Sequence, residues 1–208
     1  MSLTLFETIR RIVQEEVGQV RSAELAVVQD QHAHESASDN DNYACSVQLR
    51  NSGLVLKQVP VATGRIGMAS IPSVGDLVLV QFIGGDMNAP VITGRLYNDQ
   101  DRPPVNASDQ IILHLPLGAG DSDAVHMELQ SGDSRTIDFK LGSGLSISLQ
   151  DDDPAVEIQV DGGKAKLTIG KDGAVTVETQ GDVSVKGNQI TIEAQGQLNL
   201  KGATINLN

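Results

Sequence analysis

Apolar residues near the N-terminus recur at helical spacing. Successive members are three or four residues apart, which places them on one face of a helix. The stripe consists of Phe6, Ile9, Val13 and Val17. Thr4 and Glu7 have the spacing of a capping box, in which each side chain satisfies a free backbone N–H of the first turn. We therefore predict a short amphipathic helix within residues 1–22, whose apolar stripe must be covered by the rest of the chain or by a partner.

From about residue 23 the hydrophobic period changes to two, which is typical of strands. Turn-forming segments rich in Gly, Asn, Asp and Ser separate five short runs that are rich in β-branched residues. These runs cover residues 25–28, 43–49, 55–61, 76–82 and 91–96. Five short strands so close together predict a small closed β-barrel over residues 23–105. A proline-containing linker at residues 101–106 follows it.

The C-terminal part of the chain repeats a short unit. Pairs of aliphatic residues two positions apart recur, and their first members are spaced by 8, 7, 8 and 7 residues. The pairs are Val175/Val177, Val183/Val185, Ile190/Ile192, Leu198/Leu200 and Ile205/Leu207, with Leu167/Ile169 as an earlier copy. Each unit reads as a short strand with two inward side chains followed by a corner. Repetition at a fixed period indicates a solenoid or a fibrous stack.

The number of units indicates how many chains build this stack. Three faces of seven or eight residues make a turn of about 23 residues, so one chain would complete only about two turns. Three intertwined chains avoid this problem, because each strand then lies between strands of the other two. The paired residues would form the trimer core, and the lack of aromatic residues after Pro154 suits a narrow axis. We predict an all-β chain that ends, over residues 106–208, in an intertwined trimeric β-helix, or β-prism.

The composition is acidic and poor in aromatic residues. With 15 Lys and Arg against 27 Asp and Glu, the formal charge is −12, and there are three Phe, two Tyr and no Trp. Nucleic-acid binding needs a basic surface or stacking platforms, so we exclude it as a function. Ten of the acidic residues lie within residues 109–157, where we expect a solvated face. A divalent-cation site at Asp151–Asp153 is the alternative, but consecutive residues of an extended chain point to opposite sides and make a poor cage.

The sequence carries few chemically reactive groups. His32 and His34 resemble a metal-binding pair, yet they lie in a polar, loop-like segment without a third ligand, so we expect a solvated loop. His114 and His126 are interpreted as isolated structural histidines, and Cys45 as a small buried hydrophobe. No nucleophile, phosphate-binding or dinucleotide-binding motif is present. We therefore predict no catalytic residues, no metal site and no cofactor. The alternative function is a β-helical carbohydrate-active enzyme or acyltransferase.

One segment carries a family resemblance. Residues 72–86 hold a Gly-Asp turn and a Gly-Gly-Asp turn around an apolar strand, and residues 89–98 contain Pro-Val-Ile-Thr-Gly. This region, with Val61–Gly64 upstream, resembles the OB-fold segment of phage baseplate assembly protein V and of the VgrG spike proteins. The resemblance is strong over residues 60–105. It implies a homotrimeric central spike of a contractile tail, with an OB collar and a β-helical needle.

The resemblance also implies partners. The N-terminal stripe is expected to dock on a baseplate hub protein, and the needle to pierce the target membrane mechanically. Some relatives carry a metal-binding His-x-His tip, but no histidine follows His126 here, so we expect a separate PAAR-type tip protein. Its binding platform is predicted at Ile205, Asn206, Leu207 and Asn208. The chain would be assembled in the bacterial cytoplasm and would reside in the baseplate of a virion or injection particle. The sequence does not distinguish a phage tail, a tailocin and a non-phage injection system as the particle that contains this spike.

Overall fold

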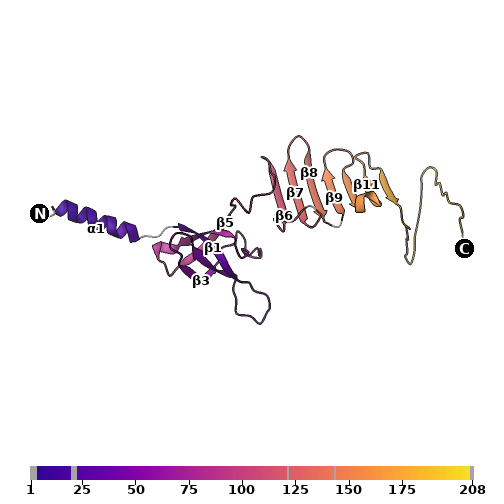
Figure 1. Cartoon of the computed structure of the whole chain (residues 1–208). Coiled ribbons are helices and arrows are strands. Elements are labelled where there is room, and N and C mark those ends of the chain that lie inside the picture. Colours follow the sequence, from indigo (N-terminus) through magenta and orange to yellow (C-terminus); the bar gives the residue numbers. More distant parts are fainter. Residues whose placement is uncertain (1–3, 20–22, 121, 143, 207–208) are drawn as a thin grey trace. The chain divides into compact units, whose positions relative to one another are not determined.

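The computed structural model describes residues 4–19, 23–120, 122–142 and 144–206, with side chains described outside residues 15–19. The chain divides into two compact units, Met1–Pro103 and Pro104–Asn208. One helix and twelve strands occur in the described residues, so the prediction of a mostly β chain is confirmed (Figure 1). No helix in this part of the chain has the length and hydrophobicity needed to span a membrane.

Helix α1 (Leu5–Gln19) confirms the N-terminal helical pattern. Its first turn is closed as the capping box predicts. The backbone N–H of Thr4 donates to Glu7 Oε2 (3.0 Å), and the N–H of Glu7 donates to Thr4 Oγ1 (3.4 Å). Two N–H groups that have no partner within the helix are thereby satisfied, so the helix begins at this point in the chain.

The first unit contains the predicted barrel. Its strands are β1 (Ala23–His32), β2 (Ala44–Leu49), β3 (Val55–Pro60), β4 (Leu77–Phe82) and β5 (Pro90–Leu96), in the order β3-β2-β1-β4-β5. All five strands overlap the runs predicted from the sequence. Val61 forms a parallel bridge with Ile92, and the N–H of Ala62 donates to the Ile92 carbonyl (2.8 Å), which brings the two ends of the sheet together.

Side chains from every barrel strand fill the core of the first unit. The buried cluster comprises Ala26, Val28, Cys45, Val47, Leu49, Val59, Val78, Val80, Phe82 and Ile92. Cys45 is fully buried, as expected of a small hydrophobe, and burial raises the pKa of its thiol. Between β4 and β5 the short 3₁₀ turn η1 (Ile83–Gly85) places Gly84 at φ 64° and Gly85 at φ 79°. Side-chain-bearing residues are strained at such angles, which explains the two glycines.

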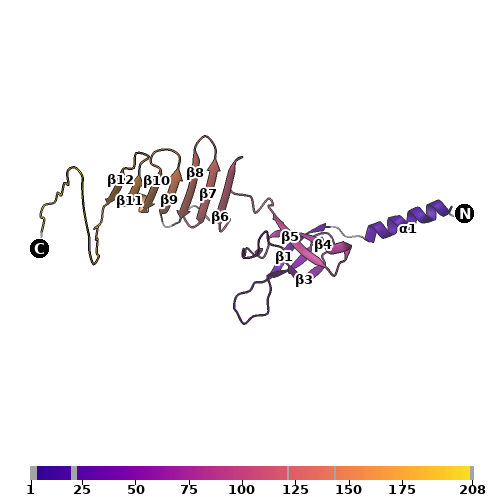
Figure 2. The same ribbon diagram turned by 180° about the vertical axis from the view of Figure 1, so that it is seen from behind.

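The second unit is a seven-stranded antiparallel sheet. Its strands are β6 (Gln110–Leu115), β7 (Val125–Ser131), β8 (Arg135–Leu141), β9 (Leu145–Gln150), β10 (Val156–Val160), β11 (Ala165–Ile169) and β12 (Val175–Thr179), with the turn η2 (Asp161–Gly163) before β11. Each strand pairs with the next one along the chain, as the ladder of strands in Figures 1 and 2 shows. Turns join regular strands across the described part of residues 109–153.

The C-terminal repeat differs from the preceding sheet. Its first two units are β11 and β12, which pair within the chain. The described residues from 180 to 206 contain no strand, and their side chains are exposed. A strand needs a hydrogen-bonded neighbour, and the single chain supplies none for this segment. The intertwined prism involves three chains, so it stays a prediction.

Candidate functional site

One face of the seven-stranded sheet is apolar from end to end. Residues two apart in a strand share a face, and the strand register aligns them across the sheet. The first row comprises Ile111, Leu129, Ile137, Leu149, Val156, Ile169 and Val175. The second comprises Leu113, Met127, Phe139, Ile147, Ile158, Leu167 and Val177. A shorter third row comprises Leu115, Val125, Leu141 and Leu145. We call these three rows the apolar face.

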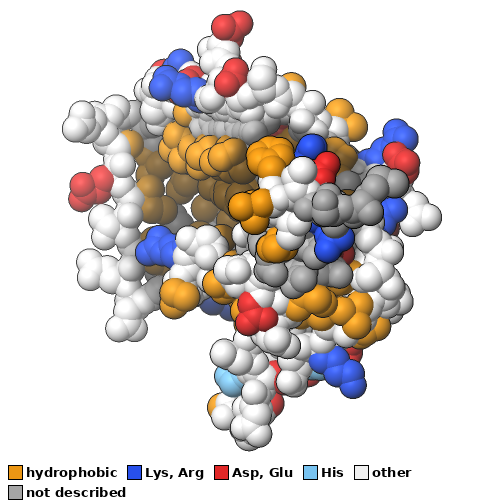
Figure 3. All heavy atoms as spheres, turned by 90° about the vertical axis from the view of Figure 1, so that its left-hand side faces the viewer, with side chains coloured by type: hydrophobic (Ala, Val, Ile, Leu, Met, Phe, Trp, Pro, Cys, Tyr) orange, Lys and Arg blue, Asp and Glu red, His pale blue; other side chains and the backbone are white. Residues whose placement is uncertain are grey.

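The apolar face is open in the part of the chain that the structure describes. Ten of its side chains are 37–66% exposed, from Ile137 at one extreme to Ile111 at the other. Hydrophobic side chains gathered on an exposed surface are also visible in Figure 3. A continuous apolar surface of this kind marks an interaction site rather than a solvated face. Four predicted trimer-core residues, Leu167, Ile169, Val175 and Val177, lie on it.

The opposite face of the sheet is polar and internally paired. Lys166 Nζ lies 2.6 Å from Glu157 Oε2 on the neighbouring strand, and the hydrogen bond from Lys166 lowers the pKa of that carboxyl. At the edge of the sheet, on the side of Ile137 and Leu149, Arg135 hydrogen-bonds to Asp151 and lowers the pKa of that carboxyl. Asp153 accepts the N–H of Lys171 (2.9 Å). These three acidic residues are therefore engaged within the sheet and its turns, and no group of three or more His, Cys, Asp or Glu in the described residues is placed to hold a metal ion.

Seven further predicted core residues lie in the segment without strands. They are Val183, Val185, Ile190, Ile192, Leu198, Leu200 and Ile205, each 50–70% exposed. Of the predicted tip platform, Ile205 and Asn206 are exposed, whereas Leu207 and Asn208 lie outside the described residues. The single chain therefore leaves this aliphatic series uncovered as far as it is described.

The predicted hub-docking stripe is also uncovered. On α1, Phe6 is 74% exposed, Ile9 51% and Val13 53%. Leu5 and Ile12 widen the stripe and are equally open. The side chain of Val17 lies outside the described residues. The described part of the stripe is thus available to a partner.

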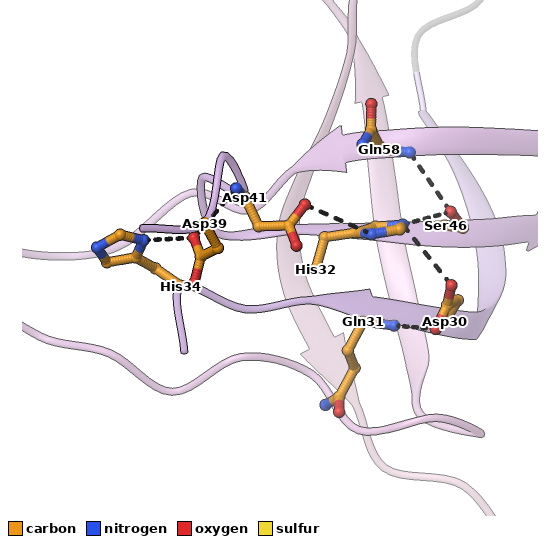
Figure 4. Close-up of polar contacts among 8 residues, drawn as sticks. All are labelled: Asp30, Gln31, His32, His34, Asp39, Asp41, Ser46 and Gln58. Carbon is orange, nitrogen blue, oxygen red and sulfur yellow. Dashed lines mark hydrogen bonds and ion pairs between the residues drawn. The ribbon is translucent and has the colours of Figure 1, made fainter. Parts of the chain in front are cut away.

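The two histidines of the His32-x-His34 pair point to different partners (Figure 4). His32 ends β1, where its Nε2 lies 2.9 Å from Ser46 Oγ. His34 lies in the following loop, and its Nδ1 lies 2.7 Å from Asp39 Oδ1. The two imidazoles are engaged separately, so they do not form a shared metal site in this structure. Instead they tie the loop between β1 and β2 to the barrel and to itself.

Asp41, His32 and Ser46 resemble a nucleophilic triad by residue type. His32 Nδ1 lies 3.9 Å from Asp41 Oδ1, beyond hydrogen-bond distance, and Nε2 faces the Ser46 hydroxyl (Figure 4). Ser46 is only 9% exposed and also accepts the Gln58 N–H at 3.5 Å. A nucleophile has to reach its substrate, and this hydroxyl is enclosed between strands. The arrangement is therefore structural.

His114 and His126 are not isolated, contrary to our expectation. They are register partners on β6 and β7, and their Nδ1 atoms lie 3.2 Å apart. The sequence gives little sign of this contact, because the connection between the two strands spans residues 116–124. The turn signals in that connection, read together with the alternation on either side, indicate a hairpin but do not fix the register that pairs the two histidines.

Comparison with known proteins identifies the barrel. Residues 48–97, from the end of β2 through β5, match the model of the type VI secretion system/phage-baseplate injector OB domain. The chain is also similar to two curated proteins of Pseudomonas aeruginosa, the type VI secretion system spike proteins VgrG2a and VgrG2b, with 40% identity over 47 residues in each case. The predicted relationship to VgrG-like baseplate spike proteins is confirmed.

The similarity is confined to one part of the chain. The 47 matched residues are 23% of this chain, 6% of VgrG2a and 5% of VgrG2b. The comparisons therefore place the OB domain in a structural baseplate family and leave the function of the sheet and the C-terminal repeat to be argued from their own residues.

Proposed function

We propose that this chain, which carries an injector OB domain, is the subunit of a homotrimeric central spike in a contractile injection particle. The observation that supports this most directly is the apolar face, which crosses all seven strands and is open in the single chain. In a spike, three copies would turn these faces inward around one dry axis. The polar face with its Glu157–Lys166 ion pair would then face the solvent.

Three copies fit the sequence better than two. Two sheets packed face to face would also cover the apolar rows. The units after β12, however, are spaced by seven or eight residues, which suits a three-sided turn. They also lack aromatic side chains, as the narrow axis of a three-sided prism requires. In the trimer each exposed pair from Val183 onward would lie between strands of the other two chains.

The two ends of the spike would bind different proteins. We propose that the exposed stripe of α1 docks on a baseplate hub protein. At the other end, Ile205, Asn206, Leu207 and Asn208 would form a blunt platform for a PAAR-type tip. The force of sheath contraction would pass from hub to tip and pierce the target envelope mechanically, without catalysis. Assembly in the bacterial cytoplasm, followed by residence in the baseplate, completes the proposal.

The mass of the purified full chain in solution tests the proposal. Light scattering coupled to size exclusion should give three times 22.0 kDa. A folded monomer of 22.0 kDa, or a dimer of facing sheets, would overturn it. Dilution distinguishes an intertwined trimer from a dimer of facing sheets. The three chains of an intertwined trimer must unwind before they dissociate, so the trimer should keep its mass for hours after dilution.

A further inference from the structure

His114 and His126 form an unusual contact on the polar face of the sheet. They face each other across the β6–β7 hairpin, with their ring planes at 71° and their Nδ1 atoms 3.2 Å apart. If one Nδ1 carried a proton, the two nitrogens would form an ordinary N–H···N hydrogen bond, whereas two lone pairs at this distance need a positive centre between them. The second nitrogen of each ring determines which of these cases applies.

The second nitrogen of both rings faces an acceptor. His114 Nε2 lies 2.9 Å from the carbonyl oxygen of Ala119, and a carbonyl only accepts, so this nitrogen carries the proton. His126 Nε2 lies 3.5 Å from Glu128 Oε2, and the carboxylate favours a proton there too. Both neutral rings are thereby held in the same tautomer, with the lone pair of Nδ1 directed into the contact.

We propose that these two Nδ1 atoms bind one divalent transition-metal ion of the zinc class. Zinc–nitrogen bonds of about 2.0–2.1 Å at a tetrahedral angle place two ligand nitrogens about 3.3 Å apart, close to the separation found here. A metal-binding histidine typically donates its other N–H to a carbonyl or a carboxylate, which matches the two acceptors. Water fills the other coordination positions, because no third His, Cys, Asp or Glu ligand converges here among the described residues.

Two charged residues next to the histidine pair have opposite effects on the binding of a cation. Glu128 is 22% exposed in its side chain, and Gln110 Nε2 donates to its Oε1 (2.9 Å), which holds the carboxylate in place. Lys140, on β8, is the register partner of His126 and is the nearest cationic residue by register. Its charge opposes a bound cation, whereas Glu128 favours one. The ion would close the first hairpin of the second unit, one ion for each chain.

Zinc titration of the metal-free full chain by calorimetry tests the proposal. We expect one Zn²⁺ per chain and no response to Mg²⁺, which prefers oxygen ligands. Glu128→Gln should weaken zinc binding about 10–100-fold, because it removes the negative charge that favours a proton on His126 Nε2 and a cation at Nδ1. Lys140→Met should tighten binding. His34→Ala, which removes a histidine outside the pair, should leave it unchanged.

A second measurement keeps the test independent of folding. Imidazole ¹⁵N shifts of the wild-type chain should show zinc at Nδ1 of both His114 and His126. His114→Ala and His126→Ala should each abolish the stoichiometric site while circular dichroism shows an intact sheet. Zinc binding that survives the double variant, coordination through Nε2, or a shared proton with no stoichiometric zinc binding would overturn the proposal.

Discussion

A single charge in the middle of the apolar face should prevent assembly. Ile147 lies on the central strand β9, in the second row, between Phe139 and Ile158. Full burial of an aliphatic side chain contributes about 1.5–3 kcal/mol. The ten exposed side chains of this face are roughly half exposed, so covering each one contributes about 1 kcal/mol, and a whole face about 10 kcal/mol per chain.

The substitution Ile147→Asp would place three carboxylates at one level of the axis. An unpaired carboxylate taken out of water costs several kcal/mol, and the three carboxylates also repel one another, so each chain loses a large part of the about 10 kcal/mol that covering its face contributes. We expect the species of three times 22.0 kDa to disappear, while the far-UV spectrum keeps the sheet signal. Ser146→Asp is the matched control, because it adds the same charge one residue away on the polar face, beside Lys140.

Light scattering at several concentrations measures the outcome directly. If Ile147→Asp retains the trimer mass, the face does not line the axis and the reasoning is refuted. Loss of the trimer in Ser146→Asp as well would show that charge at any position on β9 disrupts the sheet. The prediction requires that the two variants behave differently.

The remaining predictions concern the barrel, the two ends and the pH dependence. Leu49→Ala, at a fully buried core position, should lower the free energy of unfolding of the OB domain by about 2–5 kcal/mol in denaturant titrations, whereas Leu54→Ala, 42% exposed, should change it far less. Deleting residues 1–20 should leave a trimer of the shortened chain but abolish capture by the baseplate hub; a truncated chain that fails to fold would instead make the helix structural. Leu207→Lys should abolish binding of the tip protein in a pull-down while the trimer persists. The pKa of Glu157 is held below its ordinary value of 4.5 by the hydrogen bond from Lys166. Its contribution to stability is therefore complete above pH 4.5 and is lost as the pH falls through the lower pKa of the folded state. When melting temperature is measured against pH, Glu157→Gln should make the decrease at acidic pH shallower.

Much of the first unit follows from local signals. The capping box at Thr4 and the turn at Gly84 each constrain a few neighbouring residues, and both predicted features are present. Alternation within residues 43–49 predicts a strand, and β2 is found there, although all its residues except Gln48 are buried. These features depend on contacts within a few residues, which is why spacing alone reveals them.

Other features depend on register between distant residues. Aliphatic pairs such as Leu167/Ile169 are obvious in the sequence, but their alignment with Leu113 and Ile111 across the sheet requires every hairpin turn to be placed correctly. A shift of one residue would move each side chain to the opposite face. The facing imidazoles of His114 and His126 were missed for the same reason.

The order of strands in the second unit has a consequence for how the molecule forms. Each strand from β6 to β12 pairs with its immediate successor, so the contacts of this sheet join residues that are close in sequence. Such low contact order favours rapid folding of one chain on its own. The segment 180–206 has no strand partner of its own in the described chain. In the proposed spike, each newly synthesised chain would therefore fold its seven-stranded sheet without the other two. Only the intertwining of the last residues of the three chains would become slower on dilution.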